Sequence, residues 1–190
     1  ESYNFALKQC TGKYVAILEC DDVWLSEKLQ IQVDTLEQKP ECVLSWGKAY
    51  LSAIDLSYNY YLAPRNDMDE NLFYNKPVGI FLKKFIYSTL IPALTIVFRR
   101  DALLEIGGFV QGFNLPLVDI PTTLELLMLG EFAYINKPLG HWRIYPNQVT
   151  KTYTGQMTTS YYALIQSFMD RFPAAFKEHG LTKEVIDNHF

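Results

Sequence analysis

The order of apolar and polar positions predicts strands and helices that alternate along most of the chain. Residues 14–18 (Y-V-A-I-L) form a continuous apolar run, which is typical of a strand buried on both faces, as in a parallel sheet. Further strands are predicted at residues 43–50, 93–99 and 132–135. Helical spacing of apolar positions predicts the helices between them, at residues 2–10, 26–38, 77–87, 101–106 and 122–129. Alternating strands and helices indicate an α/β fold.

The helix at residues 26–38 shows the helical pattern most clearly. Leu29, Val33 and Leu36 follow one another at spacings of four and three, so we expect them to form its buried face. Pro40 disfavours helical backbone at the residue before it, so the helix is expected to end there.

Residues 151–190 differ from the rest of the chain. Apolar side chains at helical spacing predict one aromatic-rich helix face, made by Tyr161, Ile165, Phe168 and Phe172. We expect this face either to fold back on the preceding residues or to form the contact of a homodimer. The sequence is therefore divided into residues 1–150 and a C-terminal helical extension, residues 151–190.

The composition fits a folded domain with a sizeable core, since 49% of the 190 residues are hydrophobic and 20% are charged. The net charge is −4 and no basic block is present, which argues against nucleic acid as a partner. No apolar run reaches the roughly 18 residues of a membrane-spanning helix. The cysteines (Cys10, Cys20 and Cys42) lack C-x-x-C spacing, so we expect reduced, intracellular thiols rather than a disulfide scaffold or a zinc ribbon.

The first predicted strand runs directly into acidic residues, Glu19, Asp21 and Asp22. In open α/β sheets ligands bind outside the carboxyl ends of strands, where carboxylates offer hard oxygen ligands to Mg²⁺ or Mn²⁺. A turn or a helix cap is an equally simple interpretation. Two other chemistries share the pattern: a Walker B strand, for which no G-x-x-x-x-G-K-[ST] is present, and a phosphatase with an aspartyl nucleophile.

Four parts of the chain carry motifs in a distinctive order, at residues 4–24, 98–109, 118–130 and 142–149. They are N-F-A-L followed by G-K-Y-V-A-I-L-E-C-D-D-V-W, then F-R-R with G-G-F, the V-D pair with its helix to a Gly, and W-R-I-Y-P-N-Q-V. Taken together, they resemble the elements of family 2 glycosyltransferases, which are inverting enzymes of the GT-A fold. The first resembles the N-x-A-L…G-x-Y-h-x-x-L-D-S-D-D-x-W stretch of that family.

The resemblance implies a GT-A-like mixed sheet flanked by helices, and transfer of a sugar with inversion. The donor would be a nucleotide-sugar and the acceptor a saccharide or a lipid-linked molecule, in bacterial cell-envelope or capsular polysaccharide synthesis. By position in the family's elements, Asp119 is the catalytic base, and Glu19, Asp21 and Arg143 contact the donor. Asp21 and Asp22 are the expected ligands of Mn²⁺ or Mg²⁺.

Each of these roles has a simpler alternative. Asp119 stands two residues before Pro121 at a predicted helix start, where Asp commonly acts as an N-cap. Arg143 can suit phosphate through its bidentate fork, or can lie on a surface strand beside a packed Trp142. The segment 51–76, rich in Tyr, Asn and Asp, is predicted to be a long loop or insertion. Its aromatic residues either pack within the protein or stack on sugar rings; they are Tyr58, Tyr60 and Tyr61.

Four positions depart from the family pattern. Glu19 stands where the family has Asp, and Val118 where it has Glu. Glu125 replaces an Arg, and Tyr145 replaces a His. The changes at Glu19, Val118 and Tyr145, together with the N-terminal part that we expect to be missing, motivate an alternative: a non-catalytic glycosyltransferase-like module that binds a carbohydrate or a partner protein.

The resemblance also implies what surrounds the chain. In the family, βαβ units that hold the nucleotide base precede the Asn4 segment, so we expect the sequence to lack an N-terminal nucleotide-binding segment of a larger catalytic domain. It also implies a cytoplasmic location at the inner face of the membrane, with peripheral membrane association.

Overall fold

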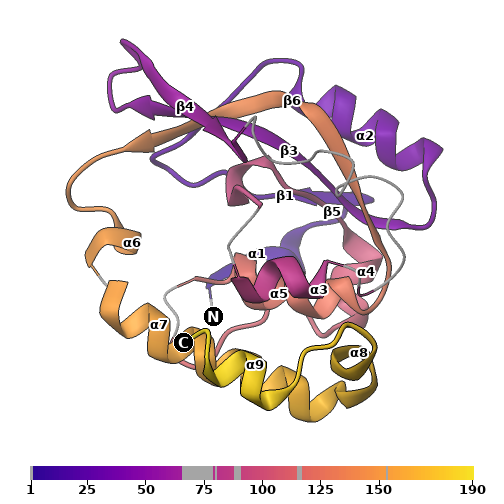
Figure 1. Cartoon of the computed structure of the whole chain (residues 1–190). Helices are drawn as coiled ribbons and strands as arrows, with labels where there is room; N and C mark the ends of the chain where they lie inside the picture. The colour runs from indigo at the N-terminus through magenta and orange to yellow at the C-terminus, as the bar shows by residue number, and fades with distance from the viewer. Residues whose placement is uncertain (1, 66–78, 80, 88–90, 115–116, 153) are drawn as a thin grey trace.

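The computed structural model describes residues 2–65, 79, 81–87, 91–114, 117–152 and 154–190. Its strands are β1 (Tyr14–Ala16), β2 (Val23–Trp24), β3 (Cys42–Ala53), β4 (Asn59–Ala63), β5 (Val97–Arg99) and β6 (Glu131–Ile144). Its helices are α1 (Ser2–Gln9), α2 (Lys28–Gln38), α3 (Leu82–Tyr87), α4 (Arg100–Glu105), α5 (Asp119–Leu127), α6 (Val149–Thr152), α7 (Thr154–Arg171), α8 (Pro173–Glu178) and α9 (Lys183–Asp187), with a 3-10 helix η2 (Ala93–Thr95). Figure 1 shows α2 on one side of the sheet, α1, α3, α4 and α5 on the other, and α7, α8 and α9 as a further layer beneath them.

The sheet is mixed, as predicted. Its strand order is β1-β5-β3-β6-β2, with β4 paired to β3. The long strands β3 and β6 run parallel, whereas the other pairings are antiparallel. The predicted α/β class with a mixed sheet flanked by helices is therefore confirmed.

The expectation of a parallel strand at residues 14–18 is wrong, because in the described structure β1 pairs antiparallel with β5. The apolar run was nevertheless a correct sign that the strand packs on both of its faces. Val15 belongs to the main core, and Tyr14 and Ala16 pack against a smaller cluster on the α2 side. Hydrophobicity records burial but carries no information on the direction of the neighbouring strand.

The predicted buried face of α2 is also partly wrong. The structure buries Lys28, Gln32 and Leu36, whereas Leu29 is 43% exposed. Gln32 is held by its side-chain Nε2, which donates to the carbonyl oxygens of Ser45 at 2.9 Å and Thr95 at 2.7 Å. Burial of polar side chains through hydrogen bonds is invisible to a pattern that counts only apolar positions.

Two strands, β3 and β6, are longer than predicted. The expected long loop at residues 51–76 begins instead as a hairpin, in which β3 continues to Ala53 and β4 pairs with it; residues 66–76 lie outside the described part. The strand expected at residues 132–135 extends over Glu131–Ile144. Pro138 and Gly140 look like breaks in the sequence, but the β3–β6 ladder accommodates them through register shifts.

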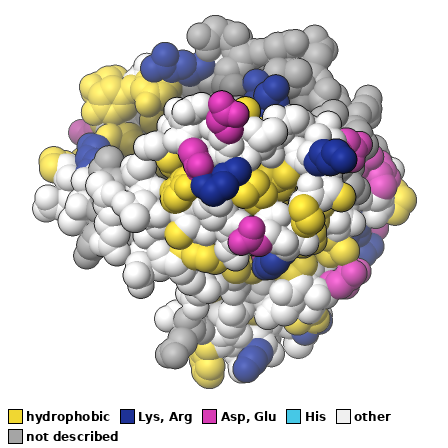
Figure 2. Space-filling view, turned by 60° about the horizontal axis from the view of Figure 1, so that its bottom comes forward, with side chains coloured by type: hydrophobic (Ala, Val, Ile, Leu, Met, Phe, Trp, Pro, Cys, Tyr) yellow, Lys and Arg dark blue, Asp and Glu magenta, His cyan; other side chains and the backbone are white. Residues whose placement is uncertain are grey.

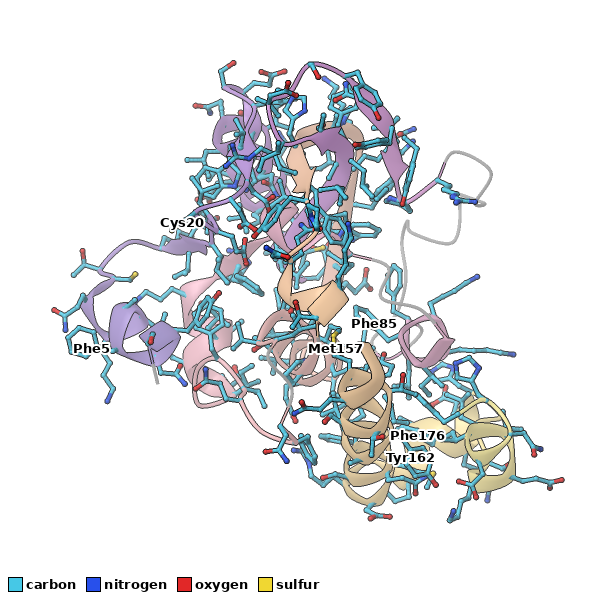
Figure 3. All side chains as sticks on the ribbon, turned by 90° about the vertical axis from the view of Figure 1, so that its left-hand side faces the viewer. Phe5, Cys20, Phe85, Met157, Tyr162 and Phe176 are labelled. Atoms are coloured by element: carbon cyan, nitrogen blue, oxygen red, sulfur yellow. The ribbon has the colours of Figure 1, made fainter. Side chains whose placement is uncertain are left out.

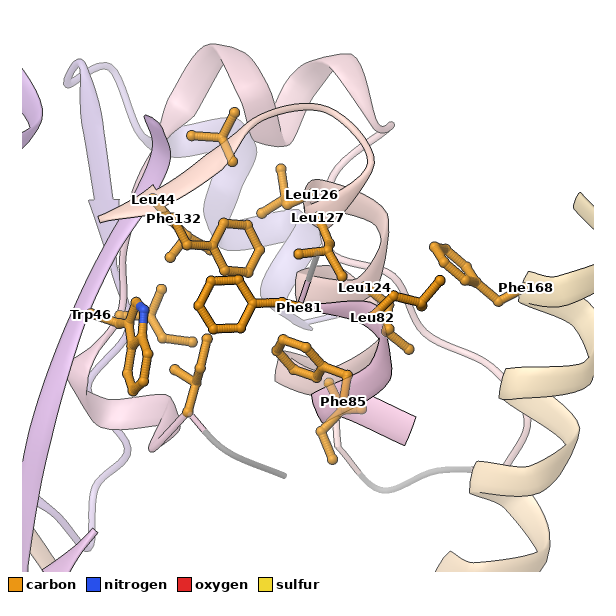
Figure 4. Packing of buried hydrophobic residues seen from close by; sticks show 14 of the residues in the cluster. Leu44, Trp46, Phe81, Leu82, Phe85, Leu124, Leu126, Leu127, Phe132 and Phe168 are labelled. Carbon is orange, nitrogen blue, oxygen red and sulfur yellow. The ribbon is translucent and has the colours of Figure 1, made fainter. Parts of the chain in front are cut away.

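The core lies between the sheet and the inner helices. Three aromatic side chains pack together there: Trp46 of β3, Phe132 of β6, and Phe81, which directly precedes α3 (Figure 4). The rings of Phe81 and Phe132 are stacked, with their centroids 6.0 Å apart. All three side chains are almost fully buried.

The aromatic face of the C-terminal residues folds back on this core. Ile165 and Phe168 are completely or almost completely buried in the same cluster as Phe81, and Phe176 joins them from α8 (Figure 3). The fold-back alternative is confirmed, whereas the homodimer and the domain boundary at residue 150 stay predictions. The outer face of these helices carries charges of both signs among small apolar areas (Figure 2). No helix in the described ranges is both long and apolar enough to cross a membrane.

Two of the segments that carry the family resemblance meet in space. The side-chain amide of Asn4 donates to the Phe109 carbonyl and accepts from the Phe109 amide, both at 2.7 Å. Gly108 has φ +100°, and a Cβ there would lie 2.4 Å from Asn4 Oδ1. The contact fixes α1 against the loop after α4, and α1 in turn supplies Tyr3 to the site described next.

Candidate active site

A cavity of about 330 Å³ opens between the acidic loop before β2, the start of α5 and the end of β6. One wall is acidic. It gathers carboxylates from segments about a hundred residues apart, and they are Glu19, Asp21, Asp22 and Asp119. The structure thus brings together four of the five residues predicted for the site, and the fifth, Arg143, lies directly behind the acidic loop.

Arg143 ties the acidic loop to β6. Its backbone amide donates to Asp22 Oδ1 at 3.1 Å, and its guanidinium donates to the carbonyl oxygens of Asp21, Cys20 and Ile54. These hydrogen bonds hold the Asp21 backbone and the Asp22 side chain in place. The predicted contact of Arg143 with the donor remains a prediction.

Tyr145, which stands where the family has His, also contacts the acidic loop. Its hydroxyl donates to Asp21 Oδ2 at 2.8 Å. Gln148 supports this end of β6, since its Nε2 donates to the Arg143 carbonyl oxygen at 2.7 Å. One oxygen of Asp21 is therefore already held by a neutral donor, while the other faces no partner among the hydrogen bonds described.

The carboxyl groups of the acidic wall ionise less readily than exposed ones. Burial raises the pKa of Glu19 to about 7, and repulsion by Asp119, Asp22 and Asp21 adds to the increase. Burial also raises the pKa of Asp22 to about 6 and raises that of Asp119 above its ordinary value. Glu19 Oε2 has no hydrogen-bond partner in the described structure. Such a wall favours a cation or a proton donor in the cavity.

The donor set suits a hard divalent cation that is shared with a substrate. In the described residues, no group of three or more His, Cys, Asp or Glu side chains is arranged to hold a metal ion. Mg²⁺, however, usually binds through one or two carboxylates together with substrate phosphates. Asp21 and Asp22 offer such carboxylates on the cavity wall.

Glu19→Gln should stabilise the fold at alkaline pH. The pKa of Glu19 is higher in the folded than in the unfolded chain, so the folded state binds more protons between about pH 4.5 and 7. Its contribution to the free energy of unfolding therefore falls as pH rises through this window. We expect the variant to gain on the order of 2 kcal/mol over the original chain at pH 8 and little at pH 4.

Urea unfolding at both pH values measures this difference. Glu27→Gln is the matched control, because Glu27 is exposed and its pKa is lowered. An equal gain for the Glu19 variant at pH 4 and pH 8 would contradict the raised pKa of Glu19.

Asp119 is not the N-cap of α5. That position belongs to Val118, which makes no side-chain cap hydrogen bond, and Asp119 is the first helical residue. Backbone hydrogen bonds from Ile120 and Asp119 itself lower the pKa of this carboxyl in part, but burial outweighs them. Asp119 therefore does not occupy the N-cap position that the simpler alternative gave it, and it lines the cavity.

The sequence profile of glycosyl transferase family 2 matches residues 1–107, more than half of the chain. The chain belongs to this family. The matched residues include Glu19, Asp21 and Asp22, whereas Asp119 and Arg143 lie beyond them.

Named relatives are glycosyltransferases, and solved structures share the fold. The chain is 27% identical over 149 residues to the teichuronic acid biosynthesis glycosyltransferase TuaG of Bacillus subtilis strain 168, which covers 77% of this chain and 53% of that protein. It is 23% identical over 203 residues to the amylovoran biosynthesis glycosyltransferase AmsE of Erwinia amylovora. That match covers 91% of this chain and 68% of AmsE. The crystal structure of S. aureus TarS 1–349 in complex with UDP-GlcNAc matches with a TM-score of 0.56 at 14% identity, over 87% of this chain and 44% of that one. The chain thus spans about half the length of TuaG, and the TarS likeness supports the GT-A-like fold.

The family 2 cavity also has an apolar wall, which the sequence did not reveal. Tyr3 of α1, Leu117, Trp142 of β6 and Met157 of α7 line it. Tyr3 and Met157 are far apart in the sequence, so no local pattern could pair them. Met157, labelled in Figure 3, brings the helical extension into the wall of the site.

Proposed function

We propose that this chain forms the catalytic part of an inverting glycosyltransferase of cell-envelope polysaccharide synthesis. It would move a sugar from a nucleotide-sugar donor to a saccharide or lipid-linked acceptor. The observation that carries the proposal is the meeting of Glu19, Asp21, Asp22 and Asp119 in one cavity of a family 2 chain.

In this proposal Asp119 acts as the general base. Its carboxylate takes the proton of an acceptor hydroxyl as that oxygen attacks the anomeric carbon, and the nucleoside diphosphate leaves from the opposite face. A carboxyl with a raised pKa holds a proton more tightly than an ordinary Asp, which suits it to this role. Asp21 and Asp22 face the diphosphate side, where Arg143 and Tyr145 fix their position.

A divalent cation, when bound, would neutralise the charge that develops on the leaving diphosphate. Asp21 and Asp22 would hold it. Glu19, in the place of the usual Asp, keeps a carboxyl group at the edge of the cavity.

The comparisons support the chemical class of both substrates. TuaG and AmsE are named for the synthesis of cell-surface polysaccharides, and structures of TarS contain UDP-GlcNAc or UDP. We therefore infer a UDP-sugar as donor for this chain and a surface polysaccharide as product. A cytoplasmic location at the inner face of the membrane is part of the same proposal.

Calorimetric titration of UDP into the full-length protein tests the donor site. With Mn²⁺ present we expect saturable binding, weakened at least about tenfold by EDTA or by Asp21→Asn. Asp34→Asn, on the exposed surface of α2, is the matched control and should bind as the original protein does.

Two outcomes would count against the proposal. If UDP bound equally well with Mn²⁺ and with EDTA, a divalent cation would not take part in donor binding. An absence of UDP binding under both conditions would favour the alternative of a non-catalytic module that binds a carbohydrate or a partner protein.

A further inference from the structure

Three side chains lie in register across neighbouring strands. Trp142 of β6 pairs with Leu51 of β3, and Leu51 pairs with Tyr61 of β4. Cross-strand partners project from the same face of a sheet. Because neighbouring strands lie about 4.8 Å apart, the row extends about 10 Å from Trp142 to Tyr61.

This face of the sheet is the one that borders the cavity. Trp142 lines the cavity from β6, and Ala63 lines it from β4. Ala63 and Tyr61 are two positions apart on one strand, so their side chains project from the same face. The row therefore leads out of the cavity, across β3, to the hairpin that extends from the sheet in Figure 1.

The outer end of the row is open to solvent. Tyr61 is 48% exposed, whereas Leu51 is only 6% exposed beside it. The guanidinium of Arg65 lies 5.4 Å from the centre of the Tyr61 ring. An aromatic ring with a hydroxyl tip and a guanidinium placed over it suits a sugar, which combines an apolar ring face with a polar rim.

The charge of the hairpin argues against a membrane surface as the occupant. Between residues 42 and 65 the exposed charged side chains are one anion, Asp55, and one cation, Arg65. Peripheral membrane segments usually carry Lys and Arg in excess. A saccharide needs no such excess, and the continuity of the row with the cavity places it on the path of an acceptor.

We propose that Trp142 and Tyr61, which lie on either side of the buried Leu51, form an acceptor track that binds a saccharide of several residues. The sugar that carries the reacting hydroxyl lies in the cavity beside Trp142, and a more distant sugar of the same chain stacks on Tyr61 and contacts Arg65. Tyr61 is then a residue that selects for acceptor length. The assignment rests on the proposed function, because it takes the cavity as the place of transfer.

Binding of oligosaccharides of increasing length tests the track. The probes are chito-oligosaccharides and oligogalacturonides of one to six residues, a neutral and an acidic series, titrated into the full-length protein and followed by ligand-observed NMR. We expect affinity to increase with length in at least one series. Tyr61→Ala should lower the affinity of the longest probe about tenfold and leave the monosaccharide unaffected. Tyr61→Phe should retain the dependence on length.

Tyr60→Ala is the matched control. Tyr60 is also 48% exposed and lies at the register shift of the same strand, without a cross-strand partner in the row. The proposed track would be refuted if affinity did not depend on length in either series. It would also be refuted if Tyr60→Ala lowered the affinity of the longest probe as much as Tyr61→Ala does. UDP binding, measured on the same samples, separates this result from a failure of the proposed function, because Tyr61→Ala should leave it unchanged.

Discussion

Asp119→Asn is expected to lower the rate of sugar transfer by about 10³-fold or more while UDP binding stays nearly intact. General-base catalysis typically contributes about 10²- to 10⁴-fold, and an amide cannot take the proton of the acceptor hydroxyl. The side chains are nearly equal in size, so the cavity wall keeps its shape. Release of UDP from a UDP-sugar, in the presence of a cell-envelope polysaccharide fraction, measures the rate.

The control makes the same chemical change at another helix start. Asp101 lies in the first turn of α4, is exposed and is remote from the cavity lining. Asp101→Asn should transfer sugar at the original rate. Unchanged turnover in the Asp119 variant would show that a different group removes the proton.

Phe168→Ala is expected to lower the free energy of unfolding by about 3–5 kcal/mol. The ring is 1% exposed and lies against Phe172 and Phe176, at centroid distances of 4.7 and 6.2 Å. Its loss leaves a cavity where the C-terminal helices meet the main core. For a domain of this size, the melting temperature should fall by roughly 6–20 °C.

Phe5→Ala provides the comparison, because Phe5 is 70% exposed and points away from the fold in Figure 3. Its melting temperature should stay close to the original value. If both variants melted alike, the packing of α7 on the core would not contribute to stability as described.

The sequence predicted those parts of the fold in which burial and residue type agree. The helix α5 is apolar on nearly all sides and is buried on nearly all sides, so its position was predicted closely. The face of α2 was not, because Lys28 and Gln32 are completely buried although both are polar. Lys28 places its Nζ 4.3 Å from the centre of the Trp24 ring, a contact that arises only from the tertiary structure.

The acidic wall was predictable for a different reason. Glu19, Asp21 and Asp22 follow a strand within four residues, and Asp119 was placed by resemblance to a family element. The apolar wall had no such signal, since Tyr3 and Met157 are joined only by the fold. Tyr145 was seen as a departure, but its hydrogen bond to Asp21 depends on the path of β6, which is longer than predicted.

The course of α7 links the site to the folding of the chain. Met157 lines the cavity near one end of this helix, and Phe168 is buried in the core three turns further on. A ligand gains its contact with Met157 only while the helix is docked, so by linkage its binding strengthens the docking. Substrate occupancy and resistance of the C-terminal helices to proteolysis should then rise together, so that the extension acts as a reporter of the occupied state.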